Sequence, residues 1–309
     1  MEFEKLIKER EFLSESGQNT LMERAKQLQS ALYAFLLDKV IAELETDEAG
    51  AFKFSVKNLQ STSRVGGIFS SYRKLSDSFG DWLIKQLLNL FGLNNKYFRE
   101  VGKVSDSLEA KTRKLLFQNL GYDIEKKEII KSSWLDNLLA QETVKQQVIN
   151  RLSAAIQSKM DAKTFRTQFR DAFLDNNAGL GLVTKNMDFH TQNIFMSFDR
   201  AAQAVYKEQL GLEHAIYSGT IMQPTKSSPG TRSFCWRRVN NLYDNATINE
   251  WNKQDWAGKI EGSDVKVTAG GYRCRHHFSW VSKEIAEQLQ KKGKVLNHLN
   301  PPKPDKKAK

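Results

Sequence analysis

The chain has 309 residues, 40% of them hydrophobic and 27% charged, with a formal net charge of +11. These values are typical of a folded protein with one large domain or two ordinary ones. No apolar run reaches the ~18 to 20 residues that span a bilayer, and residues 1–5 lack the apolar core of a signal peptide. We therefore expect a protein made in the cytoplasm, without a membrane-spanning segment.

Residues 1–210 are predicted to form a mostly α-helical body. No proline occurs before Pro224, and proline is excluded from helix interiors. Hydrophobic residues recur at helical spacing, which favours core-facing helices over any cofactor role. The hydrophobic stripes are Leu21, Ala25, Leu28, Leu32 and Phe35; Ile84, Leu87, Leu88 and Phe91; Val144, Val148, Leu152, Ala155 and Ile156; Phe165, Phe169 and Phe173; and Met187, Ile194, Phe198, Ala201 and Val205.

Other residues mark the expected limits of these helices. Asp161 is a predicted N-cap, and Gly92 and Gly211 are predicted to end helices. Gly66 and Gly67 follow a polar stretch and predict a loop or hinge.

Residues 211–290 are predicted to form a small α+β domain. Residues 215–217 and the alternating residues 264–268 are typical of short strands, and residues 223–230 of a loop. Asn240 and Asn241 predict a tight turn.

Capping residues in the same domain predict two helices. The spacing of Thr247 and Glu250 is that of a capping box, so we expect a helix from Ile248 to about Trp256. Ser282 is expected to cap a last helix, which gives way to a basic flexible tail at residues 291–309.

The tail carries seven lysines and one aspartate. It can contact DNA phosphates without sequence preference, or it can serve solubility alone. The lysines are Lys291, Lys292, Lys294, Lys303, Lys306, Lys307 and Lys309.

Two dense segments, residues 231–238 and 270–277, contain both cysteines of the chain, Cys235 and Cys274. Zinc ligation by these thiols and two of His276, His277 and His298 is one interpretation, but neither cysteine belongs to a Cys-x-x-Cys pair. A thiol nucleophile would need an orienting Asp or Asn, for which no recognisable spacing is present.

A nuclease is a further interpretation, with His276 and His277 acting beside Asn297 or Asn300, but acidic metal ligands are not evident. We favour a fourth interpretation, a packing and docking signature. In it the two thiols pack face to face beneath tryptophans, glycines permit a tight turn, and arginines project toward a partner. On this view the chain is not an enzyme and has neither a cofactor nor a metal.

These segments resemble the C-terminal domain of Mu F-like phage head-morphogenesis proteins, most closely the versions from phages of Bacteroidetes hosts. The likeness covers residues 198–281 and includes the lead-in at Phe198, Asp199, Arg200 and Ala201. The chain departs from the family pattern at Asn241, where glycine is expected, and at Arg273, which is often Asn. The residues that carry the signature are Arg232, Phe234, Cys235, Arg238, Trp251, Trp256, Gly258, Gly270, Gly271, Tyr272, Cys274, Arg275 and His276.

The resemblance implies a minor capsid protein that docks to the portal vertex and assists procapsid assembly, DNA packaging or ejection. It implies a virion location, in the capsid interior or at the portal. The implied partners are the portal protein, capsid or scaffold proteins, and packaged DNA bound weakly. Two alternatives stay open: a cytoplasmic DNA- or zinc-binding enzyme such as a nuclease, and a bacterial interaction protein or toxin carrier borrowed from a phage.

Overall fold

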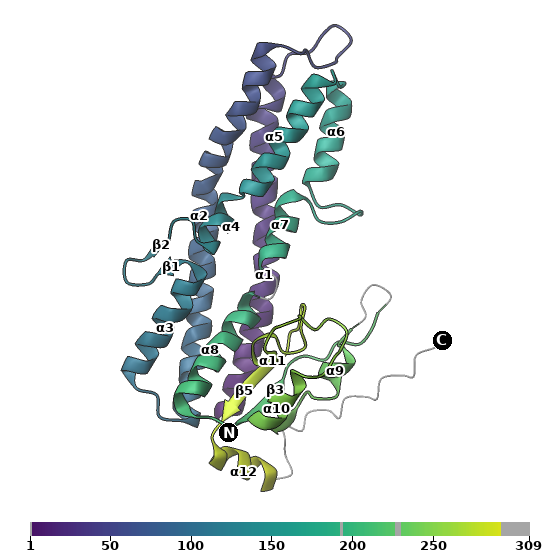
Figure 1. Cartoon of the computed structure of the whole chain (residues 1–309). Helices are drawn as coiled ribbons and strands as arrows, with labels where there is room; N and C mark the ends of the chain where they lie inside the picture. The colour runs from purple at the N-terminus through teal and green to yellow at the C-terminus, as the bar shows by residue number, and fades with distance from the viewer. Residues whose placement is uncertain (1, 192–193, 226–229, 292–309) are drawn as a thin grey trace, which may run out of the picture. The chain divides into compact units, whose positions relative to one another are not determined.

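The computed structural model describes residues 2–191, 194–225 and 230–291 (Figure 1). The protein is mostly helical (66% helix), with an N-terminal helical body and small antiparallel sheets, one of them in the C-terminal region, which confirms the predicted fold class. Two compact units can be distinguished. Unit 1 comprises Met1–Gln18, Gln86–Leu116 and Asn193–Lys309, and unit 2 comprises Asn19–Lys85 and Phe117–Gln192. The predicted domain boundaries near residues 210 and 290 stay a prediction.

Three helices account for most of residues 2–120. They are α1 (Glu2–Lys39), α2 (Val56–Val101) and α3 (Asp106–Leu120). On α1, the predicted stripe residues Leu21, Ala25 and Leu32 are buried. The prediction was wrong for Phe35, which is 41% exposed, whereas Leu36 is buried. At 3.6 residues per turn, the residue four positions after Leu32 stays on its face better than the residue three positions after it.

Three glycines that were predicted to interrupt or end a helix lie inside α2. Gly66 and Gly67 are not a loop, and Gly92 does not end the helix, which continues to Val101. A Cβ atom at any of the three positions would meet nothing within 4 Å. A glycine in a helix costs only about 1 kcal/mol relative to alanine. The buried side chains along α2, such as Val65 and Phe69, outweigh that cost.

The remaining elements of unit 2 are short. They are η1 (Ile41–Glu43), β1 (Tyr122–Asp123), β2 (Glu128–Ile129), α4 (Trp134–Ala140), α5 (Glu142–Gln157), α6 (Ala162–Phe173) and α7 (Leu182–Thr191). β1 and β2 pair antiparallel. The stripes predicted on α5 and α6 are fully buried, which confirms both. The predicted N-cap is confirmed too, because the Asp161 side chain accepts a hydrogen bond from the Thr164 amide.

The core of unit 2 combines packed aromatic rings with buried side-chain amides, one of which is Gln29. Phe169 lies between Phe165 and Phe173, with ring centroids 5.5 and 5.3 Å away. The Gln29 side chain of α1 accepts hydrogen bonds from the backbone amides of Val183 and Thr184 at the start of α7. These amides have no partner within their own helix, so Gln29 satisfies the buried N-terminus of α7.

The C-terminal elements of unit 1 surround a three-stranded antiparallel sheet of order β4-β3-β5. They are α8 (Ile194–Leu210), β3 (His214–Ser218), α9 (Ser233–Trp236), β4 (Asn241–Asp244), α10 (Asn245–Trp251), α11 (Val265–Thr268), β5 (His277–Val281) and α12 (Lys283–Lys291). In the sheet, Ala215 pairs with Tyr243 and Trp280, and the strand predicted at residues 215–217 is confirmed.

The stripe predicted from Met187 to Val205 is divided between α7 and α8, and residues 192 and 193 lie outside the described residues. Met187, Ile194 and Phe198 are buried, as predicted, whereas Ala201 and Val205 are only half-buried. Gly211 directly follows α8 with φ +61, which confirms the predicted helix end.

Two predictions in the C-terminal region were wrong. Where a strand was predicted at residues 264–268, Val265–Thr268 form the short helix α11, and the Asp264 side chain caps it by accepting a hydrogen bond from the Lys266 amide. α10 begins at Asn245 and ends at Trp251, since Asp244, not Thr247, is its N-cap. An Asp at this position caps as well as Ser or Thr does, so the earlier residue starts the helix.

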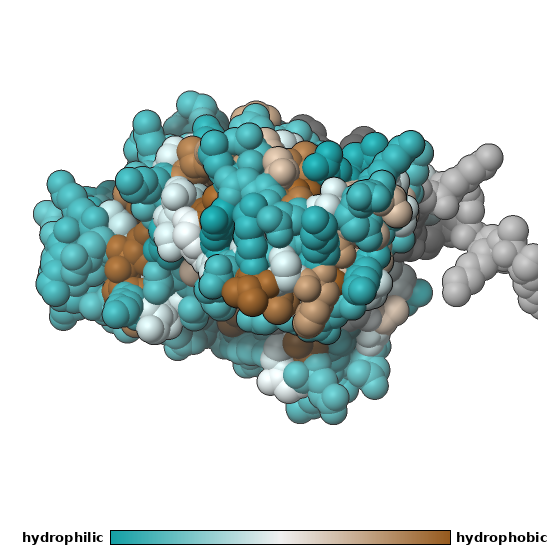
Figure 2. All heavy atoms as spheres, turned by 90° about the horizontal axis from the view of Figure 1, so that it is seen from above, coloured by the Kyte–Doolittle hydropathy of each residue, from teal (hydrophilic) through white to brown (hydrophobic). Residues whose placement is uncertain are grey.

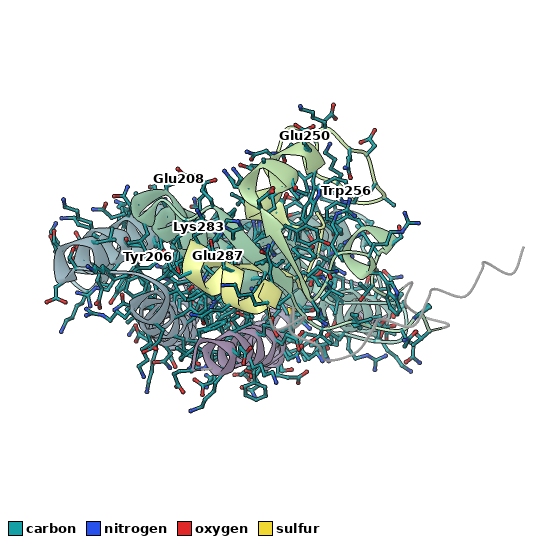
Figure 3. The ribbon with its side chains drawn as sticks, turned by 90° about the horizontal axis from the view of Figure 1, so that it is seen from below. Tyr206, Glu208, Glu250, Trp256, Lys283 and Glu287 are labelled. Carbon is teal, nitrogen blue, oxygen red and sulfur yellow. The ribbon has the colours of Figure 1, made fainter. Side chains whose placement is uncertain are left out.

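Two other predictions there are confirmed, one of them only in part. The turn predicted at Asn240 and Asn241 is confirmed only for Asn240, which has φ +62, because Asn241 already belongs to β4 and the turn follows the helix α9. Ser282 precedes α12 and accepts a hydrogen bond from the Ile285 amide. Lys283 and Glu287, labelled in Figure 3, lie on the exposed face of α12.

Within residues 2–191, 194–225 and 230–291, no helix combines the length and the apolar character that crossing a membrane requires. The face in Figure 2 is mostly hydrophilic, with small hydrophobic patches between the polar side chains.

Candidate functional site

The two dense segments of the C-terminal region meet at the two cysteines. Cys235 lies on α9 and Cys274 in the turn after α11, and their Sγ atoms are 3.7 Å apart. Both thiols are buried and free of a disulfide. Gly270 makes this approach possible, because a Cβ atom there would lie 2.1 Å from the Cys235 Sγ. The predicted face-to-face packing of the thiols is confirmed.

Two further side chains complete a buried polar cluster around the sulfurs. The His276 Nδ1 lies 3.5 Å from the Cys274 Sγ. The Tyr217 hydroxyl donates to the Cys235 Sγ at 3.2 Å and lies 3.8 Å from the Cys274 Sγ. The rings of Tyr217 and His276 stack with centroids 5.5 Å apart and planes 6° apart. β3 thus supplies the tyrosine, and the segment leading into β5 supplies the histidine.

The two thiols differ in their affinity for protons. Burial acts to raise the pKa of Cys274, but hydrogen bonds from Cys235 and His276 outweigh it and hold that pKa well below its ordinary value. The hydrogen bond with Cys274, together with burial, raises the pKa of Cys235 far above its ordinary value. Burial also raises the pKa of Tyr217. The pair therefore loses its first proton easily and its second with difficulty, as coupled groups do.

Aromatic rings cover this cluster. Phe234 stacks on Trp256, whose position is labelled in Figure 3, with centroids 3.9 Å apart. The Trp256 indole donates a hydrogen bond to the Gly270 carbonyl at 2.9 Å. Trp251 of α10 packs edge-on against Phe234 and Tyr217. The tryptophans thus fill the core of the region.

The arginines of the signature do not all project outward as expected. The Arg238 guanidinium lies 3.9 Å from the centre of the Phe234 ring and also donates to the Phe234 carbonyl. Arg232 donates to the Tyr272 carbonyl. Both therefore hold the fold together, because a guanidinium can stack and donate at the same time. Arg275 and Tyr272 are exposed, as is Arg273 between them.

Two glycines of the signature, Gly258 and Gly271, have positive φ angles and lie where two loops touch. Gly271 has φ +92 and forms the predicted turn, and a Cβ atom there would lie against the Gly258 carbonyl. Gly258 itself has φ +87. Both glycines are needed where the two loops touch, since side chains are disfavoured at positive φ.

A pocket opens beside the thiols. Cys235, Cys274 and His276 contribute to its wall, and Arg232, Tyr272 and Arg275 belong to its basic side. Among the described residues that line the pocket, none carries a carboxylate. General acid–base catalysis by a carboxylate pair and two-metal phosphodiester cleavage both require such groups.

His277 belongs to a different buried site. Its Nδ1 lies 2.7 Å from an oxygen of Asp199 on α8. Arg10 of α1 forms a bidentate pair with the same carboxylate at 2.9 and 3.0 Å, and Asn94 of α2 donates to it at 2.8 Å. Burial acts to raise the pKa of Asp199, but Arg10 and His277 more than offset it and hold that pKa well below its ordinary range. The two adjacent histidines therefore lie in different sites, His276 beside Cys274 and His277 beside Asp199.

Arg200 connects α8 to the thiol cluster. It donates to the Cys274 carbonyl at 2.9 Å and to the Val267 carbonyl at 3.1 Å. Asp199 and Arg200 were noted in the sequence only as part of the family resemblance, and their roles were missed. A signal was present, because two adjacent charged residues interrupt an apolar helix between Phe198 and Ala202. Arg10 and Tyr217 gave no comparable signal.

The predicted DNA-contacting tail lies outside the described residues, apart from Lys291. Lys291 is exposed at the end of α12. The other six lysines, together with His298, Asn297 and Asn300, lie outside the described residues.

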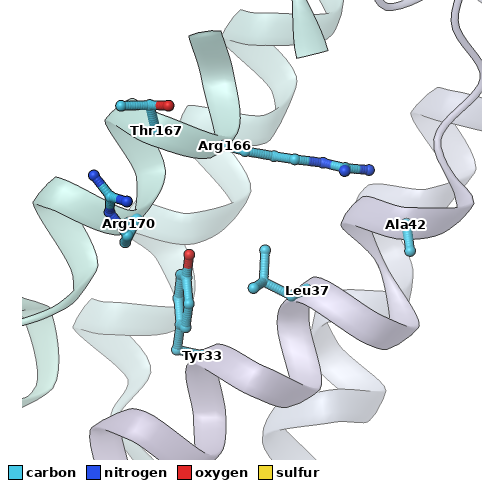
Figure 4. A pocket seen from close by; sticks show the side chains of 6 residues that line it. All are labelled: Tyr33, Leu37, Ala42, Arg166, Thr167 and Arg170. Atoms are coloured by element: carbon cyan, nitrogen blue, oxygen red, sulfur yellow. The ribbon is translucent and has the colours of Figure 1, made fainter. Parts of the chain in front are cut away.

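A second pocket lies within unit 2, between α1 and α6 (Figure 4). Tyr33 and Leu37 contribute one wall, and Arg166 and Arg170 the other. Among the described residues that line it, none is a cysteine, a histidine or a carboxylate, so they do not form a metal ligand set.

Comparisons with protein-family models, with curated proteins and with solved structures found no match to this chain.

Proposed function

We propose that the chain is a phage minor head protein of the Mu F type, which docks to the portal vertex and assists procapsid assembly, DNA packaging or ejection. The observation that supports this best is the structural role of the signature residues. Cys235, Gly270 and Cys274 meet at the centre of one small core, where they hold loops together. A structural role of this kind suits a domain that takes part in assembly.

The composition of the pocket also supports a structural role over a nuclease. Its described lining is basic and lacks carboxylates. His277, which a nuclease site would place beside His276, is bound instead to Asp199. His277 is buried against the Asp199 carboxylate, which Arg10 also binds, so it serves as a structural link between helix and strand.

The exposed part of the signature is the proposed contact with the portal. Tyr272 is 50% exposed, and Arg275 lies near it on the rim of the pocket. Tyrosine and arginine are the residue types that contribute most strongly to protein–protein interfaces.

The test is co-expression with the portal protein encoded in the same genome, followed by affinity purification of the portal ring. We expect the chain to co-purify with the ring, and the double variant Tyr272→Ala/Arg275→Glu to be lost from it. Arg166→Glu makes the same charge change on an exposed side chain of α6 and should co-purify normally. Failure of the unaltered chain to bind the ring, or the absence of portal and large-terminase genes beside its own, would contradict the proposal.

We further propose that residues 291–309 contact packaged DNA through their lysines. The charge of this segment supports weak binding without sequence preference. The measurement is DNA retention across a salt series, for the full chain and for a chain that ends at residue 290. Equal retention of both at low salt would rule out this role.

A further inference from the structure

We infer that Cys235, Cys274 and His276 bind one zinc ion, which ties α9 to the turn that leads into β5. One ligand atom from each of these residues lies within 4.8 Å of the others, and all three residues are buried. This inference does not rest on the proposed function, because it concerns how the small core is held together.

Two of the three distances between these atoms match those of a tetrahedral zinc site. With Zn–S bonds of ~2.3 Å and Zn–N bonds of ~2.0 to 2.1 Å, tetrahedral angles place two sulfurs ~3.8 Å apart and a sulfur and a nitrogen ~3.5 Å apart. The Cys235 and Cys274 sulfurs are 3.7 Å apart, and the Cys274 sulfur is 3.5 Å from the His276 Nδ1. The sulfurs are too far apart for a disulfide, whose bond is ~2.05 Å long.

The surroundings of Cys274 suit a thiolate ligand. The Gly270 amide donates to its sulfur at 3.1 Å, and the His276 amide lies 3.5 Å from it. The Arg200 guanidinium binds the carbonyl of the same residue. Backbone donors and a nearby cation stabilise negative charge on sulfur, and such outer contacts orient metal ligands. Two thiolates and one neutral imidazole would balance the charge of Zn²⁺.

A fourth coordination position is available beside these three ligands. The Tyr217 hydroxyl lies 3.2 and 3.8 Å from the two sulfurs, and the pocket reaches Cys235, Cys274 and His276. The position is therefore taken by the Tyr217 oxygen or by a water molecule from the pocket. With either occupant, the ion binds α9, the turn after α11 and the start of β5 to one another.

The sequence pattern favours packing over ligation, because neither cysteine has a second cysteine nearby in the chain. The ligands instead come from two segments 39 residues apart in sequence, of which the second contributes Cys274 and His276 two positions apart. Zinc also explains why two thiols and an imidazole face one another in a core that is otherwise aromatic.

The experiment is metal analysis of the full chain, purified without a metal-binding tag after growth with added zinc. We expect about one zinc per chain, and a loss of at least tenfold in Cys235→Ser, Cys274→Ser and His276→Gln. His190→Gln is the matched control and should retain the metal, because His190 lies in unit 2 and is not one of the three ligands. Tyr217→Phe should keep the ion if water fills the fourth position and weaken binding if the hydroxyl does.

Cobalt substitution provides a readout that does not depend on folding yield. Co²⁺ added to the metal-free chain should give the sulfur-to-metal absorption bands and the strong visible bands of a tetrahedral site, and these should weaken in His276→Gln. Circular dichroism of each variant separates loss of a ligand from loss of the fold. A correctly folded chain that takes up neither zinc nor cobalt, or variants that bind as much metal as the unaltered chain, would overturn the inference.

Discussion

The cores of the two units differ in the side chains that they bury, which are uncharged in unit 2 and include charged groups in unit 1. In unit 2, the rings of Phe165, Phe169 and Phe173 on α6 pack on one another, and the buried polar side chains include uncharged amides such as Gln29. In unit 1, the buried charges of Arg10 and Asp199 lie at the junction of several elements. An apolar core tolerates changes that preserve volume, whereas a buried charge network fails when one member is removed.

The largest expected effect follows from the charge network. Asp199→Ala should lower the free energy of unfolding by about 3 to 5 kcal/mol, because Arg10 would keep its buried charge without its partner. The measurement is chemical denaturation followed by circular dichroism. As a control, Asp171→Ala removes an exposed carboxylate paired with Arg170 and should change stability little. Equal effects of the two variants would show that the network is not a stabilising feature of unit 1.

A smaller effect is expected at the thiol cluster. Gly270→Ala should destabilise the protein by about 1 to 3 kcal/mol, since the added methyl overlaps the Cys235 sulfur and forces the two segments apart. Gly66→Ala is the matched control on α2. It should be neutral or stabilising by up to about 1 kcal/mol, because a methyl there meets nothing within 4 Å. The comparison of the two midpoints in denaturant tests the close approach at Gly270 directly.

The smallest effect belongs to the apolar core of unit 2. Ile156→Val on α5 removes one buried methyl group and should cost about 0.5 to 1.5 kcal/mol. The exposed Val56→Ala change on α2 serves as control and should cost less. A loss of unfolding free energy larger than that of Gly270→Ala would mean that the core of unit 2 tolerates changes in volume no better than the thiol cluster of unit 1 does.

Local patterns allowed much of the helical part to be predicted. The stripes predicted on α5 and α6 were correct, because apolar residues at helical spacing lie on one face of a helix and leave water when that face packs against the core. The caps at Asp161 and Ser282 were correct for an equally local reason. Predictions failed where two local signals competed, as at residues 264–268, where an alternating pattern opposed an Asp cap and the cap prevailed.

The candidate site was predictable only in part. Cys235, Cys274 and His276 were recognised from the sequence as candidate functional residues, but their spacing in the chain did not predict a metal-binding site. The separation of His276 from His277, one facing sulfur and the other Asp199, depends on where β5 begins. Successive residues of an extended segment point to opposite sides, so the strand assigns the two histidines to different sites.

The sequence by itself determined the helical body, the place of β3 and the residues of the two dense segments, because periodicity, capping and glycine are local properties. Only the tertiary structure decided that Arg10 pairs with a carboxylate 189 residues away and that two distant cysteines come within 3.7 Å. Burial makes such polar contacts necessary, since a charge or thiolate removed from water needs a partner, and only the packed chain selects which one.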